Sequence, residues 1–124
     1  MNKKVGISII VVTLLFTFAG IFLVARNQQP ANTGLDDFAK CLSGKGAVMY
    51  GAAWCSHCQK VKAAFGSSFQ YISYVECPQN PQKCVSEGVT GYPTWKFTNG
   101  SVLEGEQSLQ KISEVSACPL PETK

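Results

Sequence analysis

A long stretch without charge lies near the start of the chain. Between Lys4 and Arg26, residues 5–25 contain no Asp, Glu, Lys or Arg. A helix of this length, rising about 1.5 Å per residue, would be about 30 Å long, which matches the hydrocarbon core of a bilayer. The pattern predicts a cytoplasmic tip and transmembrane anchor over residues 1–26, and the polar residues 27–34, which include Pro and Gly, predict a flexible linker.

A cleaved signal peptide is the alternative interpretation of this stretch. The apolar region of a signal peptide spans about 7–15 residues and ends in an Ala-x-Ala-like site. The stretch here is longer, and Thr17 with Ala19 makes a poor cleavage site, which favours an uncleaved anchor. Because Lys3 and Lys4 precede the stretch and only Arg26 follows it, we expect a cytoplasmic N-terminus and an exported C-terminal domain, in a periplasm or lumen.

Downstream of the linker, helical and strand-like patterns alternate. Apolar residues at helical spacing predict helices in residues 34–42, from Ser56 onward, in 80–88 and in 108–117. Short runs rich in β-branched and aromatic residues predict strands in residues 47–52, 69–77, 93–97 and 101–105. Asn99-Gly100 predicts a tight hairpin between the last two strands.

The order of these elements predicts an α/β domain. A helix followed by β-α-β-α-β-β-α combines a parallel first half with an antiparallel hairpin, as in the mixed four-stranded sheet of the thioredoxin fold. We expect this domain over residues 35–118, with residues 119–124 as a tail. In the helix after Ser56, the spacing of Cys58, Val61, Ala64 and Phe65 predicts the buried face.

The cysteine content indicates the kind of compartment, and the charge distribution argues against nucleic acid as a partner. Six cysteines are dense for a reducing cytosol and ordinary in an oxidising compartment. From Asn27 onward, eight lysines balance eight acidic residues, so the net charge of +3 lies on Lys3, Lys4 and Arg26. This distribution gives no indication of nucleic-acid binding.

The sequence Trp54-Cys55-Ser-His57-Cys58 holds the candidate chemistry. A cysteine in the first turn of a helix meets unpaired backbone N–H groups and the positive end of the helix dipole, which favour its thiolate. We therefore expect Cys55 to be the nucleophile and Cys58 to resolve the mixed disulfide. An imidazole at His57 would further stabilise the thiolate and make the disulfide more oxidising.

Three other interpretations of this C-x-x-C are weaker. A purely structural disulfide seldom lies at a strand-to-helix junction beside a tryptophan. A zinc site would need Cys77 and Cys84 as a second ligand pair, and their spacing is wider than usual. Attachment of haem requires C-x-x-C-H, and Gln59 stands at the histidine position. We expect no metal and no cofactor bound to the chain.

A second motif, Gly91-Tyr92-Pro93-Thr94, supports the redox interpretation. A proline that opens a strand after Gly and Tyr suits a cis peptide bond in a tight turn. An ordinary trans proline at the start of a strand is the alternative. We assign Pro93 to the catalytic site, with Tyr92 and Trp54 as residues that bind the substrate.

Four segments together resemble a known family. They are MYGAAWCSHCQKVKAAFG (49–66), YVECP (74–78), GVTGYPTWKF (88–97) and GEQSL (105–109). They are similar to the thioredoxin-like domain that accompanies vitamin K epoxide reductase homologues. The resemblance implies dithiol–disulfide exchange at Cys55 and Cys58, a cis Pro93 facing them, and re-oxidation by a quinone-linked membrane partner.

The chain departs from this family pattern in two ways. General thioredoxins have a buried acid six residues before the nucleophile, where this chain has Met49, and Glu76 is a possible substitute. The four-helix reductase bundle is absent, so we expect quinone reduction by a separate vitamin K epoxide reductase-like protein.

In a thioredoxin-like fold, added N-terminal and C-terminal helices can pack together. We therefore expect structural disulfides between Cys41 and Cys118, and between Cys77 and Cys84, which bracket a short segment. The leading function is then a membrane-anchored thiol oxidoreductase that passes disulfides to exported proteins. A reductase or isomerase of the same fold and a non-catalytic binding domain stabilised by three disulfides are the alternatives.

Overall fold

The computed structural model of the chain describes residue 7, residues 10–17 and residues 34–122. The chain divides into two units, residues 1–30 and residues 31–124, and each is considered by itself. The second unit contains the strands and all six cysteines.

In the first unit, residues 10–17 are helical. The hydroxyls of Thr13 and Thr17 donate hydrogen bonds to backbone carbonyls one turn earlier, each at 2.9 Å. Within the ranges that the structure describes, no helix combines the length and the hydrophobicity needed to cross a membrane. Much of the anchor expected over residues 5–25 lies outside these ranges, as does the expected linker except for Gly34.

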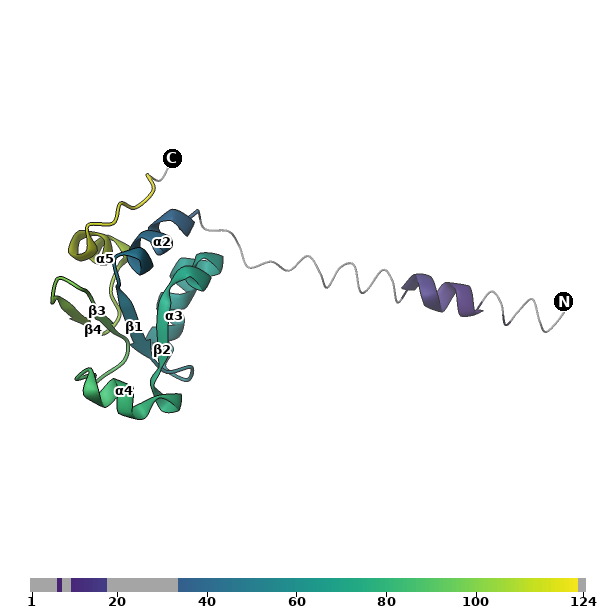
Figure 1. Cartoon of the computed structure of the whole chain (residues 1–124). Helices are drawn as coiled ribbons and strands as arrows, with labels where there is room; N and C mark the ends of the chain where they lie inside the picture. Colours follow the sequence, from purple (N-terminus) through teal and green to yellow (C-terminus); the bar gives the residue numbers. More distant parts are fainter. Residues whose placement is uncertain (1–6, 8–9, 18–33, 123–124) are drawn as a thin grey trace. The chain divides into compact units, whose positions relative to one another are not determined.

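A mixed four-stranded sheet forms the centre of the second unit (Figure 1). Its order is β2 (Ser73–Glu76), β1 (Val48–Gly51), β3 (Thr94–Lys96) and β4 (Val102–Glu104). Strands β1 and β2 are parallel, whereas β3 is antiparallel to both β1 and β4. The expected combination of a parallel crossover with an antiparallel hairpin is therefore confirmed.

Three helices cover one face of this sheet. They are α2 (Asp36–Gly44), α3 (Ser56–Phe65) and α5 (Leu109–Ser116). Phe38, Phe65 and Ile112 from these helices share one buried cluster with Met49 of β1 and Trp95 of β3. The rings of Phe38 and Phe65 stack with centroids 5.7 Å apart. Burial of each such side chain contributes about 1.5–3 kcal/mol, so this core holds the helices on the sheet.

One residue of the expected buried face of α3 lies outside the core. Cys58, Val61 and Phe65 are buried, but Ala64 is exposed. The face that packs on the sheet is the narrower stripe of positions 58, 61 and 65. Alanine is small enough to sit on either side of such a stripe at little cost.

The strand expected over residues 69–77 is shorter than its β-propensity indicates. Residues Gly66–Tyr71 form a 3-10 helix, and only Ser73–Glu76 pair with β1. Gly66 has a positive φ of 55° and ends α3, and the 3-10 turn then places the Phe69 ring against Phe65 at 6.2 Å. Tertiary packing of an aromatic residue thus overrides its local preference for a strand.

The C-terminal ends of α2 and α5 are joined to each other. A disulfide links Cys41 to Cys118, as expected. The Lys45 ammonium donates to the carbonyls of Ser116 and Ala117 at 3.0 and 2.8 Å. A cation at the C-terminus of a helix satisfies unpaired carbonyls and complements the helix dipole.

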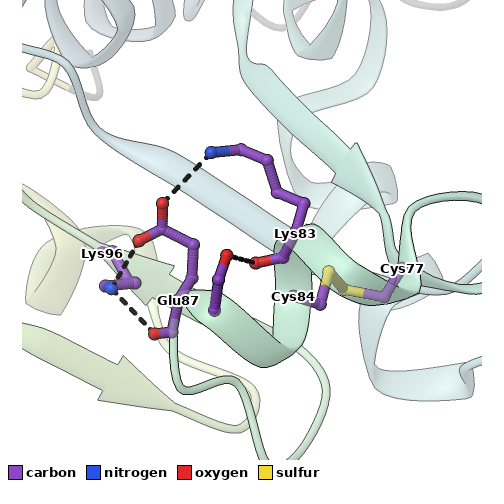
Figure 2. Close-up of polar contacts among 6 residues, drawn as sticks. Cys77, Lys83, Cys84, Glu87 and Lys96 are labelled. Atoms are coloured by element: carbon purple, nitrogen blue, oxygen red, sulfur yellow. Dashed lines mark hydrogen bonds and ion pairs between the residues drawn. A yellow bond between two sulfur atoms is a disulfide. The ribbon is translucent and has the colours of Figure 1, made fainter.

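Helix α4 (Pro81–Ser86) belongs to the other face of the sheet. Its Cys84 packs with Cys77 and Tyr50, whose side chain points away from that of the neighbouring Met49. The expected Cys77–Cys84 disulfide closes this segment. Figure 2 shows how it is held to β3: the Glu87 carboxylate accepts from Lys96 at 2.7 Å and from Lys83 at 3.1 Å.

Candidate redox site

The two remaining cysteines lie at the start of α3, directly after the end of β1 at Gly51. Cys55 is the N-cap residue, and its Sγ accepts a hydrogen bond from the backbone N–H of Cys58 at 3.3 Å. This places the sulfur among the unpaired N–H groups of the first turn, where negative charge is stabilised. Both cysteines are free thiols in this structure.

The two thiols differ in their surroundings. Cys55 retains 7% exposure, whereas Cys58 has none. Burial, together with the hydrogen bond to Cys55, raises the pKa of the Cys58 thiol to about 11. At neutral pH Cys58 is therefore a protonated thiol, whereas residue Cys55 keeps a small exposed area. This asymmetry matches an outer nucleophile and an inner resolving cysteine.

The second motif lies beside the end of β1. The Tyr92–Pro93 peptide bond is cis. Because Tyr50 pairs with Thr94 in the antiparallel β1–β3 ladder, Pro93 lies next to the end of β1, where the loop to Cys55 begins.

Two aromatic side chains mark the surface at this point. Trp54 is 72% exposed, and its ring meets the edge of the Tyr92 ring with centroids 6.0 Å apart. The structure thus brings together Trp54, Tyr92 and Pro93 from sequence positions about forty residues apart. An exposed Trp54 resting on a half-buried Tyr92 suits contact with another polypeptide.

His57 has a carboxylate partner that local sequence does not reveal. Its Nδ1 lies 2.8 Å from Oε2 of Glu106, which belongs to the segment between β4 and α5. Lys60 lies 3.5 Å from the same oxygen. The hydrogen bond from His57 holds the pKa of the Glu106 carboxyl below its ordinary value. The site therefore has a charged rim formed by residues from α3 and by Glu106, which lies 49 positions after His57.

A second carboxylate, Glu76 at the end of β2, reaches the loop between β1 and α3. Its Oε1 accepts the backbone N–H of Ala53 at 2.8 Å, and its Oε2 accepts the Tyr74 hydroxyl at 2.6 Å. The bond from Tyr74 lowers the pKa of Glu76, while burial and the same bond raise that of Tyr74. Strand alternation puts residues 74 and 76 on one face of β2, which is the sequence signal for this pair.

The absence of a side chain at Gly51 leaves room for the Tyr74 hydroxyl and the Cys58 thiol. A Cβ at Gly51 would lie 2.8 Å from Sγ of Cys58 and 3.3 Å from the Tyr74 hydroxyl. Both polar groups thus border the position of the missing side chain. Met49, two residues earlier on β1, is fully buried where a general thioredoxin has an acid, so β1 supplies no carboxylate here.

The cysteines that a zinc site would require are engaged elsewhere. Cys77 and Cys84 are bonded to each other. Within residues 34–122 and the described part of the N-terminal unit, no group of three or more His, Cys, Asp or Glu residues could hold a metal ion.

Comparisons with a family profile and with individual proteins agree on one family. The profile of the Thioredoxin family matches residues 33–116. Thiol-disulfide oxidoreductase LTO1 of Arabidopsis thaliana is 40% identical over 91 residues, which cover 66% of this chain and 24% of that protein.

Other relatives bear related names. Thioredoxin domain-containing protein 5 homolog of Drosophila melanogaster is 32% identical, over 64% of this chain and 23% of its own length. Protein disulfide isomerase-like 2-2 of Oryza sativa subsp. japonica is 35% identical, over 54% of this chain and 22% of that protein. The chain thus spans about a quarter of the length of these curated relatives.

Proposed function

Because the chain belongs to the thioredoxin family, we propose that it is a thiol–disulfide oxidoreductase that uses the Cys55–Cys58 pair. The observation that best supports this function is the unequal placement of the two thiols. Cys55 caps helix α3 and keeps contact with solvent, and Cys58 lies fully buried one turn behind it.

Exchange in the oxidising direction has two steps. A substrate thiolate attacks Sγ of Cys55 in the Cys55–Cys58 disulfide, forms a mixed disulfide, and expels Cys58 as a thiolate that takes up a proton. A second substrate thiolate then attacks the substrate sulfur, so the substrate leaves oxidised and Cys55 leaves as a thiolate. The N–H groups around Cys55 stabilise that thiolate in both directions.

The proposal extends to a membrane-anchored enzyme with its domain outside the cytoplasm. The uncharged stretch 5–25, its flanking lysines, and the density of cysteines support this placement. Two disulfides away from the redox pair suit an oxidising compartment. The acceptor of electrons from Cys55 and Cys58 would be a vitamin K epoxide reductase-like membrane protein, and the substrates would be thiols of exported proteins.

A reductase or isomerase of the same fold is the second candidate, and the names of the isomerase relatives favour it. The reduction potential of the Cys55–Cys58 pair separates the two. A dithiol oxidase has a reduction potential of about −120 mV, and a reductase has one of about −270 mV. Equilibration of the full chain with defined ratios of reduced and oxidised glutathione, followed by alkylation and mass measurement, gives this value.

A single assay tests the proposed exchange itself. The oxidised full chain should convert a reduced, unfolded protein with two cysteines into its disulfide form, whereas the Cys55→Ser variant should not. Ser56→Ala is a matched control, because this residue is exposed and adjacent. Equal activity of the wild type and Cys55→Ser would overturn the proposal and favour a non-catalytic binding domain.

A further inference from the structure

The buried thiol of Cys58 presents a problem of proton transfer. To attack the mixed disulfide at Cys55, Cys58 must become a thiolate, yet its side chain has no contact with solvent. Strand β1 carries no acidic side chain, and its buried position two residues before Gly51 is Met49. The proton therefore needs another route from the core to water.

Two polar groups of β2 lie on the side of Gly51 where Cys58 is found. The Tyr74 hydroxyl and Sγ of Cys58 both lie within 3.3 Å of the position that a Cβ would take at Gly51. The same hydroxyl donates to Oε2 of Glu76 at 2.6 Å. Because Glu76 is partly exposed, its carboxylate can exchange a proton with water. The series Cys58, Tyr74, Glu76 thus runs from the fully buried thiol to the surface.

We propose that the Tyr74 hydroxyl and the Glu76 carboxylate form the proton path of Cys58, with Glu76 as the base. This inference rests on the proposed thiol–disulfide exchange and assigns two further residues to it. In the resolving step, Cys58 passes its proton to the Tyr74 oxygen as Tyr74 passes its own proton to Glu76. The sulfur of Cys58 then bonds to Cys55, the bond between Cys55 and the substrate sulfur breaks, and the substrate leaves as a thiolate.

The charges around the path suit these roles. Tyr74 keeps its proton when Glu76 is ionised, because burial and the bond to Glu76 raise the pKa of its hydroxyl. Tyr74 therefore relays a proton and does not act as a base. The bond from Tyr74 holds the pKa of Glu76 below its ordinary value, so the carboxylate is ionised and able to accept a proton at neutral pH.

A cation completes the surroundings of the thiol. The ammonium of Lys62 lies 3.9 Å from the centre of the Tyr74 ring and favours the negative charge of both Cys58 and Glu76. The groups that act on Cys58 electrostatically are Cys55, the backbone of Ala52 and Lys62 of α3, and the Tyr74 hydroxyl of β2 interacts with both thiols. Met49 of β1 and Trp95 of β3 do not titrate.

The two thiol steps can be timed separately in one experiment. The reduced full chain is mixed in a stopped-flow instrument with an excess of an aromatic disulfide whose released thiol is coloured. Attack by Cys55 gives a first release, with a rate proportional to the concentration of reagent. Attack by Cys58 gives a second release, whose rate is independent of that concentration. Measurement from about pH 5 to about pH 10 gives a pH profile for each cysteine.

Glu76→Gln keeps an acceptor for the Ala53 N–H but removes the base, and Tyr74→Phe keeps the ring but removes the hydroxyl. Each should slow the second release by about 100-fold or more near neutral pH and leave the first nearly unchanged. The loss should shrink as the pH rises towards the raised pKa of Cys58, about 11, because hydroxide then supplies the thiolate. The double variant should be no slower than either single one, since both changes break the same path.

Glu104→Gln is the matched control, because it removes an exposed carboxylate on β4, two strands away from β1. It should leave both releases unchanged. A second release that keeps the wild-type rate and pH profile in Glu76→Gln and Tyr74→Phe would overturn the proton path. Equal slowing of both releases would also overturn it, because Glu76 would then only position the loop through Ala53. Absence of the second release from the wild type would instead overturn the proposed exchange.

Discussion

At the scale of single residues, the different surroundings of Cys55 and Cys58 at the start of α3 determine the chemistry. Cys55 accepts a backbone N–H and keeps 7% exposure. Cys58 is not exposed to solvent and has no acidic residue beside it on β1. A C-x-x-C motif alone does not distinguish these two environments. The difference arises because the outer sulfur caps the helix and the inner one faces the sheet.

Replacement of either cysteine should separate their roles. Cys55→Ser should abolish exchange, because no nucleophile reaches the surface. Cys58→Ser should instead accumulate mixed disulfides between Cys55 and its substrates, since nothing resolves them. Non-reducing electrophoresis of the full chain after reaction with a reduced protein shows these adducts. An active Cys55→Ser beside an inactive Cys58→Ser would reverse the assignment.

His57 provides a second residue-level prediction. His57→Pro removes the imidazole and its bond to Glu106 from the first turn of α3, where proline is tolerated. We expect the reduction potential of the pair to fall by several tens of millivolts, where about 30 mV corresponds to about 1.4 kcal/mol. Glutathione equilibration measures the shift, with Glu114→Gln as a remote control. An unchanged potential would show that the helix terminus alone determines it.

Gly51 allows a test of the tight packing beside Cys58. In Gly51→Ala the new Cβ would lie 2.8 Å from Sγ of Cys58 and 3.2 Å from the Tyr74 ring. Crowding of this kind costs about 1–3 kcal/mol of unfolding free energy. Urea denaturation should show this loss, whereas Gly44→Ala in α2, where a Cβ meets nothing within 4 Å, should be neutral or stabilising. Equal stability of the two variants would argue against close packing at Gly51.

At the scale of elements, α4 is a short helix that owes its position to tertiary bonds. Six residues are too few for a stable isolated helix. The Cys77–Cys84 disulfide anchors the helix at its fourth residue, and the Glu87–Lys96 pair fixes its end to β3 (Figure 2). The element therefore forms a small unit on the face of the sheet opposite to α3.

Removal of that disulfide should affect stability and leave the chemistry unchanged. For a ring closed over seven positions, the chain-entropy model gives about 2.5 kcal/mol, so a Cys77→Ser/Cys84→Ser variant should lose up to this amount. Denaturation curves measure the loss, and the reduction potential of Cys55–Cys58 should stay unchanged. A shifted potential would instead indicate a second redox pair that communicates with the first.

At the scale of the whole domain, the Cys41–Cys118 disulfide closes nearly the entire fold. The two cysteines are 77 positions apart, and Lys45 reinforces the junction by binding the end of α5. Here the chain-entropy model gives about 4.5 kcal/mol, so Cys41→Ser/Cys118→Ser should be less stable than the variant lacking the short bridge. Denaturation of both variants under identical conditions ranks them. The reverse order would show that strain or residual unfolded structure outweighs chain entropy.

Much of the domain's architecture is predictable from the sequence because it depends on neighbouring residues. Helical spacing and the Asn99-Gly100 hairpin signal predict the order of elements and the mixed sheet. The position of Cys55 before an amphipathic segment predicts its place at a helix N-terminus. The two disulfide pairings follow from the short segment that Cys77 and Cys84 bracket and from the packing of the terminal helices that the expected fold implies.

Only the tertiary structure decides which distant side chains meet. Residues 69–71 leave the strand because Phe69 packs on Phe65, a contact that no local propensity contains. Glu106, from the segment after β4, reaches His57 of α3. The Tyr74 hydroxyl comes near Cys58 because the register of β1 and β2 and the missing side chain at Gly51 leave room for both groups. The nucleophile is thus a property of local sequence, whereas its charged partners depend on contacts between elements far apart in the chain.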